Sequence, residues 1–284
     1  MSALENSRAL FAPLWQARRL LLQMTLRDLQ ARFAGSAGGL LWAWAQPALG
    51  IAAYYLVFDV VFALRAGHAG AGAQPPRLGA FLIVGMLAWM AFSDATQRAM
   101  SSLIDAAGLL QKNPLPPALF PARAVLGSTL VFAPLQLALA LAYWPLYAAP
   151  PDPATATAAP GAWAVLALPL LVLLQTLLAW LLGYLLAVLT AALRDVAQVA
   201  TFAFSIGVFA APILFPLAMF PERWRWLLWL NPMTAWVIAY QNVLLQGQWP
   251  PAAACLAMLI WLTALYALLA LTLRRCHDQL TDWL

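Results

Sequence analysis

Charge is what this sequence lacks most. Only 9% of its 284 residues are charged and 64% are hydrophobic, and the mean hydropathy is +0.81. Soluble domains carry about 25% charged residues, so this chain cannot cover a surface that faces water. The same shortage excludes a nucleic-acid-binding protein, although the isoelectric point is about 9.6. The composition therefore predicts an integral membrane protein.

Residues that perform catalysis or bind metals are also scarce. The single lysine, Lys112, stands in AGLLQKNPL, which is not the glycine-rich phosphate loop of an ATPase. The two histidines, His68 and His277, lie in a loop and near the end of the chain. Cys255 and Cys276 would be about 31 Å apart on one helix, too far for a disulfide. We therefore expect no catalytic residue, no metal site and no bound cofactor, and we expect a partner to supply the energy for any work.

Long apolar runs predict an all-α membrane protein with six transmembrane helices. The runs cover residues 40–64, 78–97, 122–147, 161–193, 196–214 and 252–273. An even number of spans places both termini on one side of the membrane. Most basic residues then fall on that side, and only Arg65, Arg77, Arg223 and Arg225 fall on the other. Cytoplasmic loops are enriched in Lys and Arg, so we predict a multi-pass inner-membrane protein with both termini in the cytoplasm.

Three further segments have helical patterns without being long enough or apolar enough to cross the bilayer. Residues 7–34 carry opposing polar and apolar stripes, which predicts an interfacial helix. Residues 99–112 form a second amphipathic segment on the cytoplasmic side. Residues 217–248 are interrupted by prolines and crowded with tryptophan, which predicts a pair of short re-entrant helices in the outer leaflet.

The predicted domain organisation follows from these segments. Residues 1–37 form the N-terminal interfacial region, 38–276 the six-span permease domain and 277–284 a cytoplasmic tail. Within the second span, Asp94 and Arg98 stand one helical turn apart and are expected to pair.

Several motifs resemble those of type-2 ATP-binding-cassette exporter permeases. TLRDLQARFAGSAGGLLWAWAQPALG (25–50) is similar to the segment by which this family enters its first span. The QKNP and FPAR stretches within 111–123 resemble the loop after the family's coupling helix, although Pro-Ala-Arg stands where Pro-Arg-Glu is usual. AALRDVAQV (191–199) and PILFPLAMFPERWRWLLWLNPMT (212–234) resemble the approach to its periplasmic gate. The resemblance covers about residues 20–275 and is closest to the branch that exports lipid-linked polysaccharide.

The resemblance implies a permease that moves O antigen, capsule or teichoic acid out of the cytoplasm. Two copies would form a homodimer and bind two copies of a separate ATPase subunit, which would hold ATP and Mg²⁺. Membrane lipids and, in some systems, a periplasmic adaptor would be further partners. The segment 99–112 would be the cytoplasmic coupling helix, and a plain interfacial connector is its alternative. Its ATPase-contacting candidates are Leu103, Ile104, Asp105 and Leu110.

The 14 tryptophans have two explanations. Tryptophan anchors proteins at the membrane–water interface, and aromatic rings can also stack on the C–H faces of sugars so that a polysaccharide slides past them. The channel candidates in the first two spans are Trp42, Trp44, Tyr54, Tyr55, Trp89 and Phe92. The adjacent pairs cannot all lie on one helical face, so some of these rings must face lipid or the core.

An exported lipid pyrophosphate needs cations where it enters. Arg27 and Arg32 are the candidates on the cytoplasmic side, through charge-assisted hydrogen bonds. Their alternative role is snorkelling to ordinary anionic headgroups. On the outer side, Arg223, Arg225 and Trp226 are candidates for the periplasmic gate.

Three other functions compete with polysaccharide export. A drug or small-lipid exporter of the same family is the main alternative, and the short outer loops favour polysaccharide over it. A membrane-embedded enzyme would need clustered acidic residues or histidines. A secondary carrier would need a chain of carboxylates within the spans.

Overall fold

The computed structural model describes residues 11–57, 78–113, 115–148 and 162–276, and every regular element in these ranges is helical. The predicted all-helical class is confirmed. The longer helices are α2 (Arg18–Arg32), α3 (Leu41–Tyr55), α5 (Leu78–Asp105), α7 (Leu119–Ala148), α8 (Leu168–Ala192), α9 (Asp195–Gly207), α11 (Met233–Gln241) and α12 (Ala252–Cys276). The short ones are α6 (Ala107–Leu110), α10 (Arg225–Leu228), the 3₁₀ turns η3 (Ala162–Ala167), η4 (Leu217–Met219) and η5 (Glu222–Trp224), and the π-helix η6 (Asn242–Gln246).

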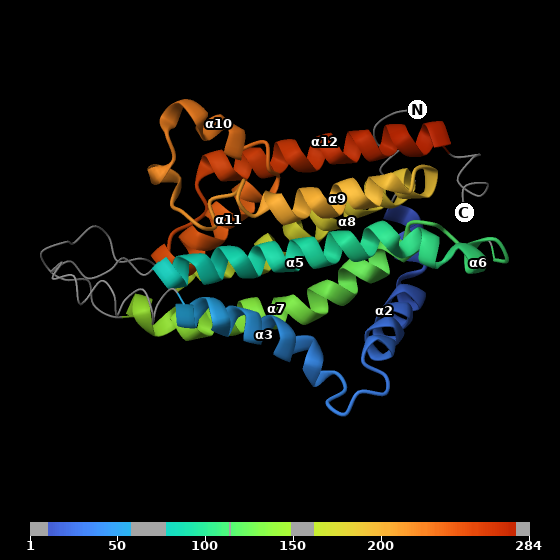
Figure 1. Cartoon of the computed structure of the whole chain (residues 1–284), viewed down its shortest axis with the longest axis horizontal. Coiled ribbons are helices and arrows are strands. Elements are labelled where there is room, and N and C mark those ends of the chain that lie inside the picture. Colours follow the sequence, from blue (N-terminus) through green and yellow to red (C-terminus); the bar gives the residue numbers. More distant parts are fainter. Residues whose placement is uncertain (1–10, 58–77, 114, 149–161, 277–284) are drawn as a thin grey trace, which may run out of the picture.

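Four of these helical stretches are long and apolar enough to cross a bilayer. They cover Gly79–Asp105, Leu119–Ala142, Trp163–Ala192 and Ala252–Cys276, and their helices run along the long axis of the molecule (Figure 1). They correspond to four of the six predicted spans. The chain is therefore a multi-pass membrane protein.

The other two predicted spans are not confirmed. α9 has 13 residues and is about 20 Å long, shorter than the hydrocarbon core of about 30 Å. The apolar run continues to residue 214, but residues 208–215 form turns before Pro216. α3 has 15 residues, and residues 58–64 of its predicted span, including Asp59, lie outside the described residues.

α5 corrects one predicted boundary. We expected the second span to end at residue 97 and a separate amphipathic helix to begin at 99, but α5 runs unbroken to Asp105. The residues after 97 are more polar, yet none of them is a glycine or proline, and the Asp94–Arg98 pair supports the helix across the change in polarity. The only separate helix that remains of the coupling segment is α6, which has four residues.

α7 continues through a proline in its interior. Pro134 would ordinarily be expected to interrupt or kink the third span, but the helix runs from Leu119 to Ala148. Membrane helices tolerate proline because neighbouring groups and small adjustments satisfy the backbone carbonyl that it frees. The fourth span begins with the 3₁₀ turn η3 and continues directly as α8.

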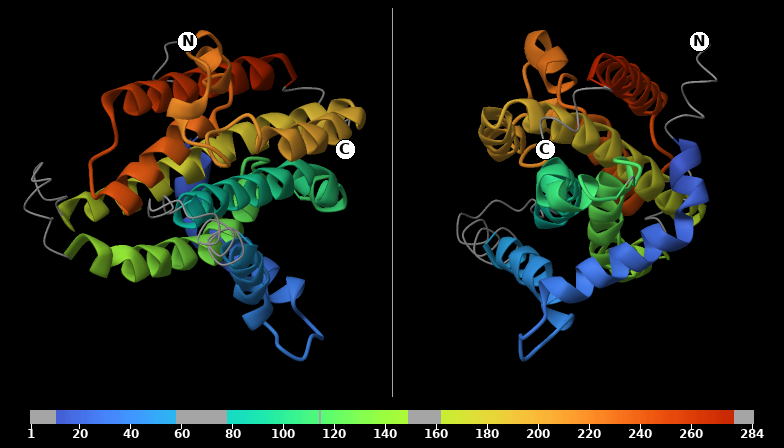
Figure 2. Two further views of the ribbon diagram at one scale, coloured as in Figure 1. Left: turned by 60° about the vertical axis from the view of Figure 1, so that its left-hand side comes forward. Right: turned by 90° about the vertical axis from the view of Figure 1, so that its right-hand side faces the viewer.

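α2 crosses the long helices instead of running parallel to them (Figures 1 and 2). It packs on α7 and buries Leu21, Thr25 and Leu29. Leu22 and Leu26, which belong to the predicted apolar stripe, remain more than half exposed. An exposed apolar face on a helix that lies across the bundle suits the predicted position at the membrane surface.

The segment 217–248 consists of short helical pieces, as its prolines predicted. α10 has four residues and α11 has nine, and the π-helix η6 ends at Gly247, whose φ of +61° favours glycine. α11 is almost wholly buried, and Trp236 is fully enclosed. That this segment is re-entrant stays a prediction.

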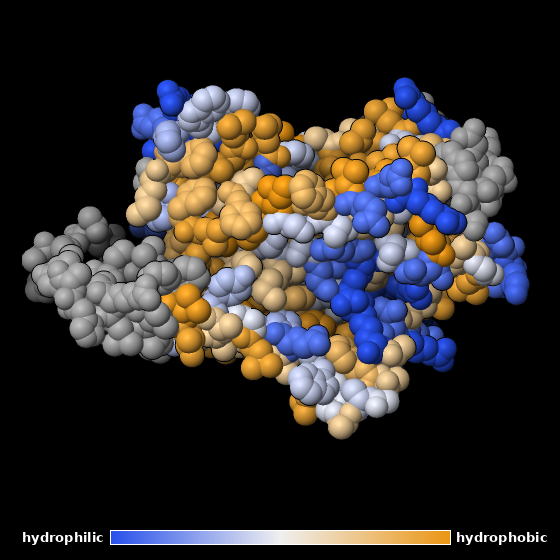
Figure 3. Space-filling view, viewed as in Figure 1, coloured by the Kyte–Doolittle hydropathy of each residue, from blue (hydrophilic) through white to orange (hydrophobic). Residues whose placement is uncertain are grey.

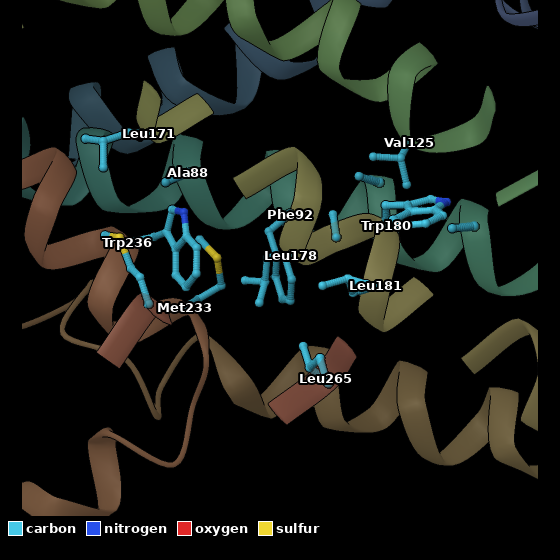
Figure 4. Packing of buried hydrophobic residues seen from close by; sticks show 14 of the residues in the cluster. Ala88, Phe92, Val125, Leu171, Leu178, Trp180, Leu181, Met233, Trp236 and Leu265 are labelled. Carbon is cyan, nitrogen blue, oxygen red and sulfur yellow. The ribbon is translucent and has the colours of Figure 1, made fainter. Parts of the chain in front are cut away.

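The core is built around α5, which packs most extensively on α8 and α7. Figure 4 shows Phe92, Leu178 and Leu181 at its centre, with Trp236 and Met233 to one side. α5 and α8 approach closely at Gly183, where an added Cβ would lie 2.5 Å from the Cβ of Ala99. Small residues allow this contact between membrane helices.

Candidate functional site

A polar stripe runs along the C-terminal half of α5, inside an otherwise apolar span. Its members are exposed or half-buried: Ser93, Asp94, Gln97, Arg98 and Ser101. Figure 3 shows hydrophilic surface gathered over this part of the molecule, with hydrophobic surface beside it. Polar side chains within a membrane span normally face a cavity or a partner, since hydrocarbon solvates them poorly.

An ion pair organises this stripe. Nε of Arg98 donates to Oδ1 of Asp94 at 2.8 Å, which confirms the predicted pair. The hydroxyl of Ser128 on α7 donates to the other carboxylate oxygen, Oδ2. Both oxygens of Asp94 are therefore hydrogen-bonded, and the carboxylate ties α5 to α7.

Arg32 reaches the same region from the last turn of α2. Its Nη2 donates to Asp28 at 2.9 Å, and its side chain is only 15% exposed. The guanidinium lies against Gly127 of α7, where an added Cβ would stand 3.1 Å from Nη2. Glycine at this position leaves room for the arginine to pack on the bundle.

These groups line a cleft of about 360 Å³ between the end of α2 and helices α3, α5 and α7. Its walls are half polar and half apolar, with Phe33, Met90 and Phe132 among the apolar residues. The polar residues that line it are Arg32, Gln46, Ser93, Asp94, Gln97 and Arg98. Charged side chains from α2 and α5 meet in this cleft, and we take it as the candidate binding site.

Sequence reasoning found Arg32, Asp94 and Arg98 but did not bring them together. The signal for the α5 stripe was present, because polar residues recur there at steps of three and four. Ser128 and Gly127 carried no signal, since their roles arise only when α7 packs against α2 and α5.

The predicted arginine pair is not brought together. Arg27 and Arg32 are five residues apart, which separates them by about 140° around α2. Arg27 is exposed and does not line the cleft, whereas Arg32 is held by Asp28.

The structure divides the aromatic candidates into two groups. Trp42, Trp44 and Tyr55 of α3 are exposed and Tyr54 is half-buried. Trp89 and Phe92 of α5 belong to the core instead, with exposed fractions of 7% and 1%.

Trp89 and Phe92 are held there by α9. An added Cβ at Gly207 would lie 2.5 Å from Cη2 of Trp89, and the rings of Phe92 and Phe204 are 5.8 Å apart. Within one chain, these two side chains are therefore packed in the core. Aromatic residues that face core, lipid or lumen look alike in a sequence, so their periodicity could not separate them.

The ATPase-contacting candidates also divide. Leu103 is fully buried in the core, whereas Ile104 and Asp105 are exposed and Leu110 is half-buried. Asp105 accepts a hydrogen bond from Ser101 at 2.9 Å. Leu109 of α6, which sequence reasoning missed, is 43% exposed, slightly more than Ile104 at 38%. Both are apolar side chains that a partner could contact at this end of the molecule.

The gate candidates lie in the turns around α10. Arg225 donates from Nε to the carbonyl of Phe220 at 3.1 Å and from Nη1 to Glu222 at 3.3 Å. Arg223 lies over the ring of Trp224, 5.6 Å from its centre, and Trp226 is 56% exposed. Arg225 thus stabilises the local turn, and Trp226 is available to lipid or substrate.

Comparison with known proteins identifies the class of this membrane protein. The family described as ABC-2 type transporter matches residues 19–245, which is most of the chain. The protein belongs to this family, whose members are transporter permeases that work with an ATP-binding-cassette partner.

Its curated relatives include the O-antigen export system permease protein RfbA of Myxococcus xanthus. That protein is 29% identical over 252 residues, which cover 86% of this chain and 87% of the relative. An O-antigen export system permease protein RfbA of Klebsiella pneumoniae is 24% identical over 228 residues, covering 80% and 81%.

Proposed function

We propose that this protein is the permease subunit of an ATP-driven exporter of lipid-linked polysaccharide. The observation that carries the proposal is the match to the ABC-2 family together with relatives named as O-antigen export permeases over more than three quarters of the chain. Its cargo would be a glycan of the O-antigen type, carried from the cytoplasm to the periplasm.

The energy would come from two copies of a separate ATPase subunit bound to a homodimer of this chain. The surface that supports this coupling is the end of α5 together with α6. Ile104 and Leu109 are exposed there, and an exposed apolar pair on a short turn suits a groove on a partner protein. Leu103 would not contact the ATPase directly, because it lies in the core.

The route of the glycan would follow α3. Trp42, Trp44 and Tyr55 are exposed on this helix, and their rings offer faces on which sugars can stack without fixed hydrogen bonds. Arg27, which is exposed on α2, would meet the pyrophosphate of the lipid anchor. Trp226, with Arg223 and Arg225 beside it, would stand at the periplasmic gate.

The proposed topology has six spans, both termini in the cytoplasm and a re-entrant segment before α12. Arg274 and Arg275 in the last turn of α12 support a cytoplasmic C-terminal end. The inner membrane of a bacterium is the expected location, as for the relatives of this family.

Deletion of the gene in its host tests the function. We expect loss of surface polysaccharide and accumulation of lipid-linked glycan inside the cell. The wild-type gene should reverse both effects, and it should fail to do so in cells whose partner ATPase is inactivated. Surface polysaccharide that stays normal, together with a changed sensitivity to drugs, would instead identify a small-molecule exporter of the same family.

A further inference from the structure

An apolar groove lies next to the polar cleft, on the neighbouring turns of α3, α5 and α7. This groove has a volume of about 450 Å³ and is open along one side. Its walls include Ala48 and Ile51 of α3, Ile83 and Leu87 of α5, and Leu135 and Ala138 of α7. The cleft is lined by neighbouring turns of these helices, so a polar hollow and an apolar hollow lie one after the other along α3, α5 and α7.

The length of the combined groove matches one leaflet of a bilayer. Asp94 in the cleft and Ile83 at the far wall are eleven residues apart on α5, which corresponds to about 16 Å. Half of a hydrocarbon core of about 30 Å is about 15 Å. If the headgroup of a lipid lies in the cleft, its acyl chains are therefore long enough to lie along the whole apolar groove.

The polar end presents hydrogen-bond donors for an anion. The charged residues that line it are Arg32, Arg98 and Asp94, and each guanidinium has five N–H donors. The hydrogen bonds of Arg32 and Arg98 to carboxylates occupy one nitrogen of each guanidinium. Asp94 has both oxygens engaged, so it is poorly placed to bind an ammonium group as well.

The charges at the polar end favour an anion of low charge. Arg32 is paired with Asp28 and Arg98 with Asp94, so the four side chains are neutral together. A phosphodiester brings one negative charge to the guanidinium N–H groups that these pairs leave free, whereas a pyrophosphate would bring more charge than the paired arginines can compensate. The remaining polar side chains, Gln46 and Gln97, are neutral and suit hydroxyl groups.

We propose that this groove binds one resident glycerophospholipid with an anionic, hydroxyl-bearing headgroup. Its phosphate lies between Arg32 and Arg98, and an acyl chain lies between α3 and the α5–α7 pair. α3 packs far less extensively on α5 than α7 and α8 do, so the lipid fills the space beside α3 and holds it against the bundle. This role is separate from the exported cargo.

The test begins with the full-length protein in vesicles that contain equal amounts of phosphatidylglycerol and phosphatidylethanolamine. After extraction in mild detergent, native mass spectrometry counts the retained lipids. We expect one phosphatidylglycerol per chain, retained about tenfold more than phosphatidylethanolamine, since both nearby carboxylates, Asp28 and Asp94, are already paired with arginines and attract an ammonium group only weakly. Equal retention of the two lipids, or preference for phosphatidylethanolamine, overturns the proposal.

Variants at both ends of the groove locate the bound lipid. Arg32→Gln and Arg98→Gln should each lower retention of phosphatidylglycerol roughly tenfold, the effect of one charge-assisted hydrogen bond. Arg19→Gln, an exposed position on α2 outside the cleft, is the matched control. Ala138→Phe fills the apolar groove and should also expel the lipid, whereas Leu137→Phe at the neighbouring exposed position should not.

A competition experiment separates a resident lipid from the cargo. A polyprenyl pyrophosphate added to the vesicles should leave the bound phosphatidylglycerol in place. Displacement of the phospholipid from the wild-type protein would assign the groove to the exported anchor and overturn the proposal, while leaving the polysaccharide-export function intact. Retention that is unchanged in the Ala138→Phe variant also overturns it.

Discussion

At the scale of single residues, the contact between Gly183 and Ala99 fixes the distance between α5 and α8. Gly183→Ala would place a methyl group 2.5 Å from the Cβ of Ala99, with the backbone of Thr96 also nearby. Neither neighbour is a flexible side chain, so the helices must separate. We expect a loss of about 1–3 kcal/mol in the free energy of unfolding, measured as a lower thermal unfolding midpoint in detergent.

Two further variants decide whether that loss comes from crowding. Gly183→Ala combined with Ala99→Gly restores the space and should recover most of the stability. Gly108→Ala is the control, because nothing lies within 4 Å of the added methyl, and this change should be neutral or slightly stabilising. A double variant that is no more stable than Gly183→Ala alone would contradict the explanation.

Trp89 and Trp42 allow the two roles of tryptophan to be separated. Trp89→Ala should cost about 3–5 kcal/mol of stability, because it removes a buried ring that packs over Gly207. Trp42, which is 44% exposed, can be changed to alanine with little effect on unfolding. If Trp42 stacks on the glycan, this second variant should slow export in cells while the amount of folded protein in the membrane stays normal.

At the scale of elements, α6 and the end of α5 should carry the contact with the ATPase. Leu109→Asp places a charge on an exposed apolar position, so the permease should remain folded but recover less ATPase in co-purification. Gly108→Ala on the same turn is the matched control and should recover the normal amount. Leu103→Asp cannot serve this test, because it buries a charge in the core and should prevent folding. Normal ATPase recovery with Leu109→Asp would remove α6 from the interface.

The elements also show how far sequence reasoning reaches. The apolar runs of α5, α7, α8 and α12 predicted the positions of four spans, with ends that differ by five residues or fewer except at the end of α5, because hydropathy over a long window reports burial in lipid directly. The pairing of Asp94 with Arg98 followed from helical spacing alone. The end of α5 was misjudged because a change in polarity was taken for the end of a helix.

The candidate site was less predictable than the spans. The cleft forms where the last turn of α2 packs over Gly127 of α7. No sequence pattern within either segment predicts that contact. Trp89 and Phe92 were assigned to a channel because an aromatic residue in an apolar helix gives no sign of whether it faces core or lumen. Tertiary packing decided both points.

At the scale of the whole molecule, the two surfaces proposed for coupling and for the gate lie at opposite ends. The polar half of α5 leads to α6 at one end, and the tryptophan-rich turns around α10 lie at the other (Figure 1). If the first end is cytoplasmic, the ATPase contact and the entry of the lipid anchor share one side of the membrane, and the gate lies on the other. The orientation of α12 tests this arrangement.

The two native cysteines report that orientation. Cys255 and Cys276 both lie on α12, 21 residues and thus about 31 Å apart, which is close to the thickness of the hydrocarbon core. Arg274 and Arg275 adjoin Cys276 and should hold it at the cytoplasmic side.

In spheroplasts, a membrane-impermeant maleimide should therefore label the Cys276→Ser variant, which retains Cys255, and should not label the Cys255→Ser variant. Both variants should react in detergent, where Cys255 is exposed and Cys276 is half-buried. Labelling of Cys276 from outside would invert the proposed topology, and labelling of both cysteines from one side would mean that α12 does not cross the membrane.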